Sequence, residues 1–353
     1  MPRIHDVGEF EAIRLMLAAR PQVAGAIVGS GDDAAVLRPE PDMDLVVTTD
    51  TFVEGRHWRA EWIGARALGA RLAAANLSDL AAMAARPRWA VVSYGVRGDH
   101  DLDALLAFDA GLGAALAAQG AGLVGGNFTA VDGPEWFGLT LFGACLPGRA
   151  WLRSGARAGD RVAVTGVPGR AGAALALAQR LGAPGRAGAA LALAQSPAPP
   201  DTDAWWAPLF EAWSAPRPRV GFARSLAAIG GVRAAIDVSD GFGSDLAHIC
   251  DASGVGVEIE SATWPRDPLL ERAAGELGVA LDALRLGPSD DYELVLAIAP
   301  DDCERCEAIA RDAKVPLKWV GRFTANPGER TWIDSKGARQ PLPRSGWDHF
   351  TQR

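Results

Sequence analysis

The sequence is poor in cysteine: it has four in 353 residues, Cys145, Cys250, Cys303 and Cys306. Four are too few for a disulfide framework in a chain of this length, and the N-terminus has no basic segment followed by an apolar run, as a signal peptide would. We therefore expect a reducing, cytoplasmic environment. Cys303 and Cys306 have the spacing of a metal or redox pair, but there is no second pair, and their charged segment favours a structural role.

The sequence also lacks an excess of basic residues, with 35 Lys and Arg against 43 Asp and Glu and a formal net charge of -8. Proteins that bind nucleic acid generally need a basic surface to neutralise phosphates, so this class is disfavoured. The longest uncharged run, 110–131, is rich in glycine and contains Gln119 and Asn127, unlike the apolar helix of about 20 residues that spans a membrane. A protein without a membrane segment, with small-molecule or protein partners, is expected.

Common motifs of phosphate binding and catalysis are absent as well. There is no G-x-x-x-x-G-K-[ST] loop, and the G-x-G-x-x-G match at Gly120, Gly122 and Gly125 follows a predicted helix and begins a predicted strand, the reverse of the dinucleotide-binding order. No nucleophile triad or histidine metal cluster is evident. Among five histidines, His57 alone lies close to an aspartate motif. Two interpretations of His57 stay open: an ordinary surface or core histidine, and a residue that contacts a substrate.

The length suits two domains. A turn-rich stretch, 147–160, could join them, and the predicted domains are therefore 1–147 and 148–353. Helices and strands alternate in both halves, which indicates an α/β (α+β) fold. The segment GRAGAALALAQ occurs at 169–179 and again at 185–195, which predicts a lengthened surface helix or a helix pair. The predicted helices are 7–19, 64–84 and 102–119, and the predicted strands are 45–49, 89–96, 122–125, 137–146 and one beginning at Arg161.

Aspartates in short motifs with Gly, Ser or Thr are the most informative feature of the chain. Taken singly, each motif fits a turn or a helix cap. Taken together, several follow short apolar runs of β type, and the ends of strands in α/β sheets are where ligands bind. Such oxygen ligands suit Mg²⁺. The set comprises Asp32 and Asp33 in GDDAAV, Asp50 in VVTTDT, Asp79 in NLSDL, Asp237 and Asp240 in IDVSDG, and Asp290 and Asp291 in SDDYEL.

These motifs, in this order, resemble the thiamine-monophosphate kinase family, whose superfamily includes aminoimidazole ribonucleotide synthetase and selenophosphate synthetase. The resemblance extends from GEFEAIRLM near the N-terminus to GWDHF near the C-terminus. The segments that carry it are TTDTFVEGRHW, AAANLSDLAAMAARP, RSGARAGDRVAVTG, AAIDVSDGFGSDLAHI and DDYELVLAI.

The resemblance implies a two-domain fold like that of aminoimidazole ribonucleotide synthetase: an N-terminal half that binds ATP and Mg²⁺ and forms a β-barrel shared in a homodimer, and a C-terminal α/β domain. It implies ATP-dependent phosphorylation of thiamine monophosphate to thiamine diphosphate, with several Mg²⁺ ions. The implied metal ligands are Asp33, Thr48, Thr49, Asp50, Asp79, Asp237, Asp240 and, less securely, Asn127. Gly126, Asn127, Arg153 and Ser239 would bind ATP, and His57, Asp290 and Trp347 would bind thiamine monophosphate.

This chemistry explains why no catalytic base is expected. A phosphate monoester has its second pKa near 6, so its oxygen is already a charged nucleophile at neutral pH. ATP and the acceptor phosphate together bring about six negative charges into one site, which bound Mg²⁺ would offset while aligning the groups for direct in-line transfer. Trp347 could also stack on the cationic thiazolium ring.

Three positions depart from the family pattern. Gly125-Gly126-Asn127-Phe128 stands where Gly-Gly-Asp-Thr is usual, Pro288-Ser289-Asp290 replaces Gly-Gly-Glu, and Ala110 stands about where the family has a tyrosine near the nucleotide. A neutral amide holds Mg²⁺ more weakly than a carboxylate. Two alternatives therefore stay open: a related ATP-dependent phosphotransferase acting on a different phosphorylated metabolite, and a non-catalytic nucleotide-binding homologue.

Overall fold

The computed structural model describes residues 2–30, 33–180, 205–343 and 346–347. The chain divides into two compact units: unit 1 comprises residues 1–80 and 85–148, and unit 2 comprises residues 81–84 and 149–353. The sequence predicted a boundary after residue 147. Asp32 and the second copy of the repeated segment, 185–195, lie outside the described residues.

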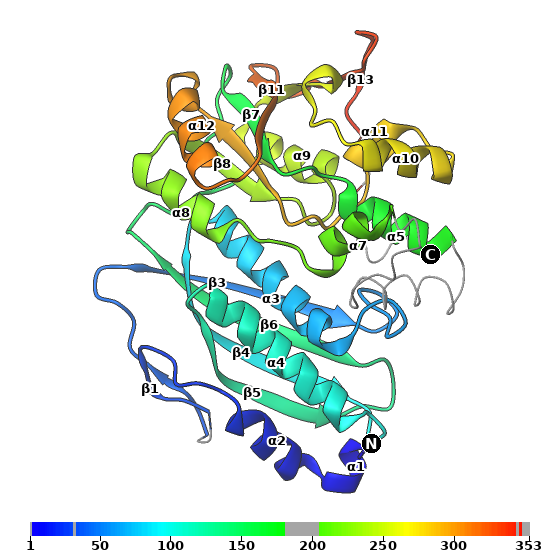
Figure 1. The fold of residues 1–353 in the computed structure, drawn as a ribbon. Helices are drawn as coiled ribbons and strands as arrows, with labels where there is room; N and C mark the ends of the chain where they lie inside the picture. Colours follow the sequence, from blue (N-terminus) through cyan, green and yellow to red (C-terminus); the bar gives the residue numbers. More distant parts are fainter. Residues whose placement is uncertain (1, 31–32, 181–204, 344–345, 348–353) are drawn as a thin grey trace. The chain divides into compact units, whose positions relative to one another are not determined.

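Unit 1 is built on a four-stranded sheet in the order β3-β6-β4-β5, and helices α3 and α4 lie against it (Figure 1). β4, α4 and β5 form a βαβ unit, because β4 and β5 pair in parallel and α4 connects them. The elements are α1 (Ile4–Val7), α2 (Glu9–Ala18), β1 (Ala26–Val28), β2 (Val36–Leu37), β3 (Asp44–Val53), α3 (Ala65–Ala82), β4 (Arg86–Val96), α4 (Leu102–Ala118), β5 (Gly122–Ala130) and β6 (Trp136–Cys145).

The two faces of this sheet have different surroundings. Phe137, Leu139 and Leu141 of β6 are buried, and the Phe137 ring stacks on Phe108 of α4 at 4.0 Å between centroids. The β3 residues opposite these three therefore belong to the helix-covered face. Val47 of β3 points the other way and is 52% exposed, so the second face is open in the single chain.

Two glycines allow α3 and α4 to pack with their backbones in contact. A Cβ atom added at Gly69 of α3 would lie 2.1 Å from the carbonyl oxygen of Phe108, and one added at Gly111 of α4 would lie 1.9 Å from that of Arg66. The rest of α3 is rich in alanine and leucine, which favour helix and fill the narrow space between helix and sheet. This close packing fixes the position of Asp79, one of the predicted metal ligands.

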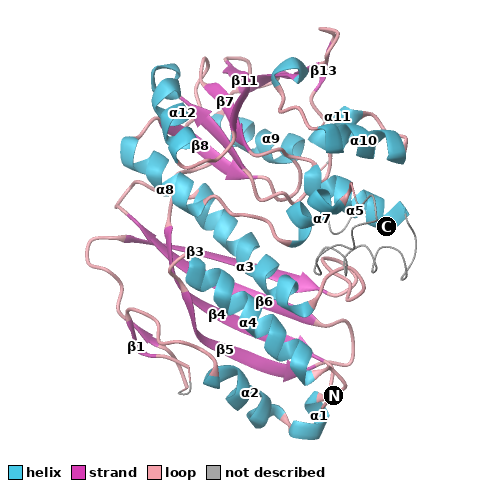
Figure 2. Ribbon diagram, in the orientation of Figure 1, coloured by secondary structure: helices cyan, strands magenta, loops and turns pink. Residues whose placement is uncertain are grey.

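Unit 2 contains a seven-stranded mixed sheet in the order β13-β12-β9-β11-β7-β10-β8 (Figure 2). Its core includes Val162, Val164, Ile236, Phe242 and Val295, each at most 3% exposed. The elements are β7 (Arg161–Thr165), α5 (Arg170–Arg180), α7 (Ala207–Ser214), α8 (Val220–Ile229), β8 (Val232–Asp237), α9 (Phe242–Ser253), β9 (Gly256–Glu260), α10 (Pro268–Leu277), α11 (Leu281–Leu286), β10 (Leu294–Ile298), α12 (Cys303–Asp312), β11 (Leu317–Thr324), β12 (Arg330–Ile333), β13 (Arg339–Pro341), and the 3₁₀ turns Ser261–Thr263 and Pro300–Asp302.

The predicted helices and strands of unit 1 are confirmed in type and approximate position, and the mixed α/β architecture is confirmed. The strand predicted at 45–49 is too short, however, and the prediction that Asp50 follows the end of a strand is wrong. β3 continues to Val53 because Thr48, Thr49, Thr51 and Val53 are β-branched and favour extended backbone. The first repeat copy forms helix α5, and the lengthened helix or helix pair stays a prediction because the second copy lies outside the described residues.

Two further predictions concern cysteines and membrane segments. Cys303 and Cys306 lie on the charged helix α12 as predicted, with Cys306 fully buried. In the part of the chain that the structure describes, no helix has the length and apolar character needed to cross a membrane. The sheet of unit 1 is open at both edges, so the shared barrel stays a prediction.

Candidate active site

Thr48, Asp50 and Asp79 lie together in unit 1. The Thr48 hydroxyl donates a hydrogen bond to the Asp79 carboxylate. Thr48 and Asp50 are two residues apart on β3, so both side chains extend from the helix-covered face toward α3, which carries Asp79. Burial, followed by the charge of Asp79, raises the pKa of Asp50 to about 7. Two carboxyl groups and one hydroxyl thus meet at one place, and a cation there would relieve their repulsion.

His57 is fixed beside this cluster. Its Nδ1 accepts a hydrogen bond from the backbone N–H of Val53 at 3.0 Å, so the hydrogen of the neutral ring is on Nε2. The ring stacks on Phe52, at 5.5 Å between centroids and an interplanar angle of 8°. Phe52 lies on the same face of β3 as Asp50, and the Arg71 guanidinium lies 5.2 Å from its ring centroid. The predicted substrate residue therefore presents an N–H donor near the predicted metal ligands.

Thr49 differs from its neighbours, because its side chain lies on the open face of the sheet. Its hydroxyl donates to the Leu139 carbonyl oxygen and accepts from the Thr140 hydroxyl, both at 3.0 Å. The predicted ligands Thr48, Thr49 and Asp50 are consecutive in sequence, but the alternation of β3 divides their side chains between two faces. Only a backbone oxygen of Thr49 could join the cluster on the helix side.

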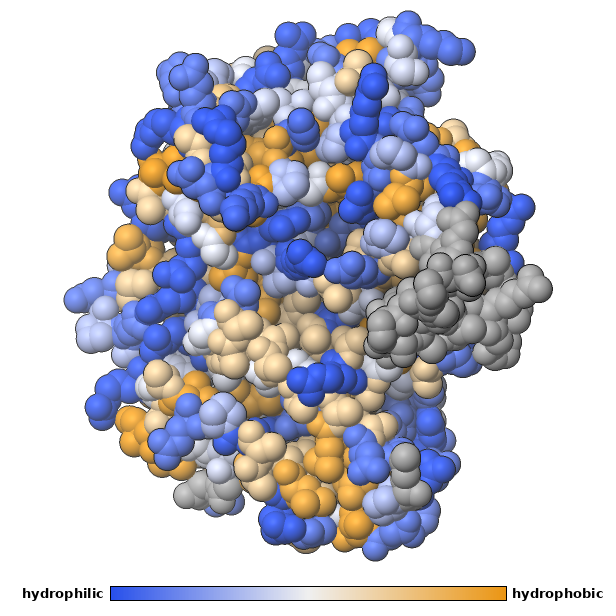
Figure 3. All heavy atoms as spheres, in the orientation of Figure 1, coloured by the Kyte–Doolittle hydropathy of each residue, from blue (hydrophilic) through white to orange (hydrophobic). Residues whose placement is uncertain are grey.

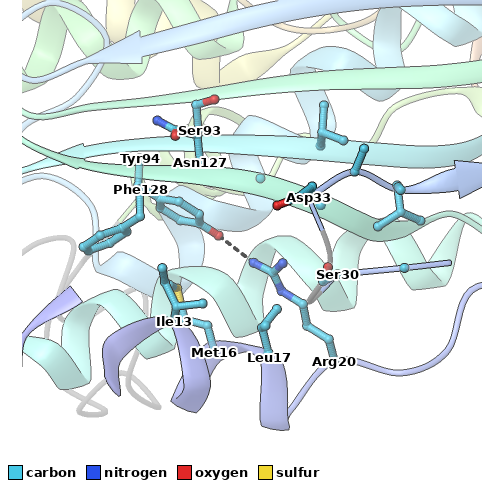
Figure 4. A pocket seen from close by; sticks show the side chains of 17 residues that line it. Ile13, Met16, Leu17, Arg20, Ser30, Asp33, Ser93, Tyr94, Asn127 and Phe128 are labelled. Carbon is cyan, nitrogen blue, oxygen red and sulfur yellow. Dashed lines mark hydrogen bonds between the residues drawn. The ribbon is translucent and has the colours of Figure 1, made fainter. Parts of the chain in front are cut away.

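A pocket of about 520 Å³ opens between α2, residues 29–30 and 33–35, and strands β4 and β5. Asp33, Gly126 and Asn127, three predicted site residues, line it. Asn127 pairs with Ser93 across β4 and β5, and both side chains face the pocket (Figure 4). The pocket thus combines bare glycine backbone with oxygen-bearing side chains on one wall and apolar residues of α2 on another.

The sequence analysis did not single out Tyr94 and Arg20, an aromatic and a basic residue of this pocket. The Arg20 guanidinium bonds to the Asp109 carboxylate at 2.7 Å. It also donates to the Tyr94 hydroxyl at 3.1 Å, the bond drawn in Figure 4. The Tyr94 hydroxyl donates in turn to Asp109. Burial, together with the negative charge of Asp109, raises the pKa of Tyr94 well above its ordinary value, so the hydroxyl keeps its proton. Arg20 follows the end of α2, Tyr94 lies on β4 and Asp109 lies on α4, and no motif marks them in the sequence.

In unit 2, Asp237, Ser239 and Asp240 lie at the end of β8. Asp237 is the last residue of the strand and is 4% exposed. The next loop is held by Asp245, whose carboxylate accepts hydrogen bonds from the backbone N–H groups of Ser239, Asp240 and Gly241 at 3.0 to 3.1 Å. Burial and, after it, the charge of Asp240 raise the pKa of Asp245 to about 7, against the effect of those donors. Asp245 therefore shapes the loop, although the sequence analysis did not single it out.

The loop contacts the other predicted residues of unit 2. The backbone N–H of Trp347 donates to the Asp240 carbonyl oxygen at 3.0 Å. Tyr292 donates its backbone N–H to the carbonyl oxygen of Val238, the residue between Asp237 and Ser239, which brings Asp290 to the same edge of the sheet. Tyr292 has φ 54°, a left-handed conformation that is uncommon for a bulky residue. Asp237, Ser239, Asp240, Asp290 and Trp347 are thus collected around one loop.

Ser289 and Asp291 hold the segment before β10 to the start of α5. The Asp291 carboxylate accepts from the backbone N–H groups of Gly169 and Ala171, and the Ser289 hydroxyl donates to it at 2.6 Å and accepts from Gly172 N–H at 2.8 Å. Burial raises the pKa of Asp291 to about 6 despite these donors. Neither Pro288 nor Ser289 has positive φ, so the loss of two glycines from the family pattern leaves no strained backbone at these positions.

Arg153 lies on a segment that runs beside β8. The Leu152 carbonyl oxygen accepts from the Ala235 N–H, and the Arg153 side chain is exposed. Each unit thus brings together its own subset of the predicted residues: Thr48, Asp50, Asp79 and His57 in one cluster of unit 1, Asp33, Gly126 and Asn127 in its pocket, and the loop cluster in unit 2. Within the described ranges, no three His, Cys, Asp or Glu side chains form a group able to hold a metal ion.

Comparison with known proteins decides the family. Residues 31–145 match the N-terminal domain of AIR synthase related proteins, and residues 157–334 match their C-terminal domain. A protein of Salmonella typhimurium named thiamine-monophosphate kinase is 32% identical over 344 residues, covering 97% of this chain and 98% of that protein. The chain belongs to the thiamine-monophosphate kinase family.

Solved structures of thiamine-monophosphate kinases agree with this assignment. The crystal structure of the kinase from Stenotrophomonas maltophilia K279a is 31% identical, covers 93% of this chain and 95% of its own, and superposes with a TM-score of 0.77. The structure of AaThiL complexed with AMPPCP and TMP covers 99% of both chains with a TM-score of 0.72, and at 24% identity it supports the fold alone. The two-domain α/β fold of the family is therefore established for this chain.

Proposed function

We propose that the protein transfers the terminal phosphoryl group of ATP to thiamine monophosphate, forming thiamine diphosphate and ADP. The observation that carries this proposal is the 32% identity to a thiamine-monophosphate kinase over nearly the whole of both chains. The residues gathered in each unit agree with it, because they are carboxylates, hydroxyls and bare backbone rather than a nucleophile and its base. Such groups can bind and align phosphates, and little else is needed when the acceptor oxygen is already charged.

The pocket of unit 1 is our candidate for the nucleotide site. At about 520 Å³ it falls within the size range typical of small-molecule sites. Gly125 and Gly126 expose strand backbone to the pocket, and Ser93 and Asn127 add donors for phosphate oxygens. Asp33 lies in the same pocket and could hold a cation bound to those phosphates. Ser239 and Arg153 of unit 2 remain candidates for nucleotide contact on the family resemblance.

The residues present fit the Mg²⁺ that this chemistry requires. Asp50, Asp79 and the Thr48 hydroxyl provide hard oxygen donors on one face of the sheet, and the pKa of Asp50 is raised because its carboxyl is buried beside Asp79. Asp237 and Asp240 would provide a second carboxylate pair at the end of β8. Bound Mg²⁺ would supply charge neutralisation for the two phosphate groups. Asn127 would contribute at most a neutral carbonyl oxygen.

The substrate contacts follow from the orientation of three side chains. His57 offers its Nε2–H as a donor to a phosphate oxygen, and Phe52 and the Val53 amide hold the ring in place. Asp290 and Trp347 flank the loop of Asp240 and would contact the thiamine rings, where an indole could stack on the cationic thiazolium.

We further infer that the protein acts as a homodimer. The open face of the unit 1 sheet exposes the apolar side chains of Leu45 and Val47, each 52% exposed, and the edge of β3 away from β6 pairs with no strand in the described part of the chain. A second copy would cover both features and close the predicted barrel, since edge strands and apolar sheet faces are normally protected. Sedimentation or light scattering of the purified protein tests this directly.

The activity is tested by incubating the full chain with ATP, Mg²⁺ and thiamine monophosphate and measuring thiamine diphosphate and ADP. We expect equal amounts of both products, no turnover for Asp240→Asn, and normal turnover for the exposed control Asp132→Asn. No thiamine diphosphate at enzyme concentrations near that of the substrate would contradict the proposal. ADP without thiamine diphosphate would indicate a different acceptor.

A further inference from the structure

The nucleotide pocket has two chemically different ends. Figure 4 shows Phe128, Tyr94 and Ile13 at one end of the view, and Asp33 and Ser30 at the other, with Met16 and Leu17 below. Figure 3 shows that apolar side chains gather at the surface around α2, the helix that forms this lower wall. A nucleotide has the same division, with an aromatic base at one end and charged phosphates at the other.

The rings at the aromatic end of the pocket are held in place by packing and hydrogen bonds. Phe128 is half-buried, lines the pocket and packs against Tyr94, with 5.9 Å between ring centroids at 49°. Tyr94 cannot easily turn, since Phe108 and Phe137 meet its ring edge to face at 6.0 and 6.1 Å. Its hydroxyl is held by Arg20 and Asp109 as well. Phe128 therefore packs at a tilt against a fixed ring, and its lining position leaves ring surface toward the cavity.

Residue 110 supplies no second aromatic ring to the pocket, because it is an alanine. Ala110, which stands where the family resemblance would place a tyrosine near the nucleotide, is exposed on α4 and is not among the residues that line the pocket. Phe128 and Tyr94 are the aromatic residues of the described pocket lining, and Tyr94 is 2% exposed. Phe128 is consequently the ring available for stacking.

We propose that Phe128 is the stacking surface for the base of the nucleotide, so that the pocket binds a purine ring at its Phe128 end and the phosphates toward Asp33 at the other end. This inference rests on the proposed function of the pocket. It adds a residue that determines affinity for the base rather than for the phosphates. An aromatic side chain binds a base by stacking on its ring. Such a contact accepts different bases, because every base has a π face.

The test compares ligands that do and do not carry a base. Isothermal titration of the full chain in Mg²⁺ is carried out with ATP and with inorganic tripolyphosphate, for the wild type and for Phe128→Leu, Phe128→Ala and Phe128→Trp. We expect Phe128→Ala to weaken ATP binding about tenfold or more, as loss of a base-stacking ring does, and tripolyphosphate binding less than twofold. Phe128→Leu retains apolar volume and should fall between, and Phe128→Trp should bind ATP at least as well as the wild type.

A second measurement does not depend on tripolyphosphate affinity. Ethenoadenosine triphosphate loses fluorescence when its base stacks on an aromatic ring, so we expect quenching in the wild type and Phe128→Trp and much less in Phe128→Leu. Phe10→Leu is the matched control, because Phe10 is on α2 but is 84% exposed and outside the pocket lining. It should behave as the wild type in every measurement.

Three results would overturn the inference: unchanged ATP affinity in both Phe128→Leu and Phe128→Ala, parallel weakening of ATP and tripolyphosphate, or quenching in Phe128→Leu equal to that of the wild type. Failure of the proposed function looks different. A wild-type chain that binds no ATP would remove the nucleotide pocket itself, whereas normal wild-type binding with unaffected variants would remove only the role of Phe128.

Discussion

Replacing Asp50 by asparagine is expected to abolish turnover and at the same time to stabilise unit 1 at alkaline pH. Burial and the charge of Asp79 raise the pKa of Asp50 from 3.8 to about 7. The folded chain therefore holds this proton more tightly than the unfolded chain. The free energy of unfolding falls as the pH rises from about 4 to about 7, because the folded state must then accommodate a buried charge beside another.

The magnitude follows from the same shift. A rise in pKa from 3.8 to about 7 corresponds to at most about 4 kcal/mol of destabilisation above pH 7, and to none below pH 4. Asparagine has nearly the same shape without the charge. With about 2–4 °C of melting temperature for each kcal/mol, Asp50→Asn should melt up to roughly 8–16 °C above the wild type at pH 8 and close to it at pH 4.5.

The assay is thermal unfolding in EDTA at a series of pH values from 4.5 to 8.5, followed by a repeat with Mg²⁺ at pH 8. Mg²⁺ should raise the melting temperature of the wild type more than that of Asp50→Asn, because the variant has lost one charged donor. Asp132→Asn, an exposed aspartate in the same unit, is the matched control and should follow the wild type throughout. A difference between Asp50→Asn and the wild type that does not change with pH would refute the reasoning.

Three further predictions concern other residues. Asn127→Asp should lower the Mg²⁺ concentration needed for half-maximal rate, since it restores a charged oxygen to the pocket; an unchanged Mg²⁺ dependence would mean that residue 127 does not contact metal. Ser289→Ala should lower the free energy of unfolding by about 1–3 kcal/mol in urea titrations, because Gly172 N–H loses its acceptor, while an effect below measurement error would contradict the bond. Arg219→Met should destabilise unit 2 by about 3–5 kcal/mol, because Glu293, which bonds to Arg219 at 2.7 Å, would be left charged and only 13% exposed; recovery in the double variant with Glu293→Gln checks the assignment.

The sequence predicted the type and order of the unit 1 elements well, because the β-branched residues of β3 and the alanine-rich composition of α3 are local properties. Only the family resemblance predicted that Asp50 and Asp79 lie together, since Asp79 is 29 positions further along the chain, on helix α3. Asp50 itself was misplaced at a strand end, because the predicted strand 45–49 stops before the charged Asp50, whereas β3 continues through Asp50 to Val53.

The residues that were missed share one property: their role is created by tertiary contact. Arg20, Tyr94 and Asp109 are separated by up to 89 positions and form one hydrogen-bonded group. Asp245 was visible in the motif GFGSD, but nothing in the sequence says that its carboxylate binds three backbone N–H groups. Phe128 was noticed as a departure from the family, and only the pocket gives the ring a position.

The alternation of β3 has a consequence for how this chain can change during evolution. Even-numbered residues from Thr48 to Phe52 serve the buried, acidic side of the sheet, and odd-numbered ones serve the side that faces outward. Substitutions affect these two sets independently. The loss or gain of one residue upstream in the strand would exchange the sets, directing Val47 and Thr49 at Asp79 and exposing the carboxylate of Asp50. Strand length, more than the identity of any one side chain, is therefore the property that this region must keep.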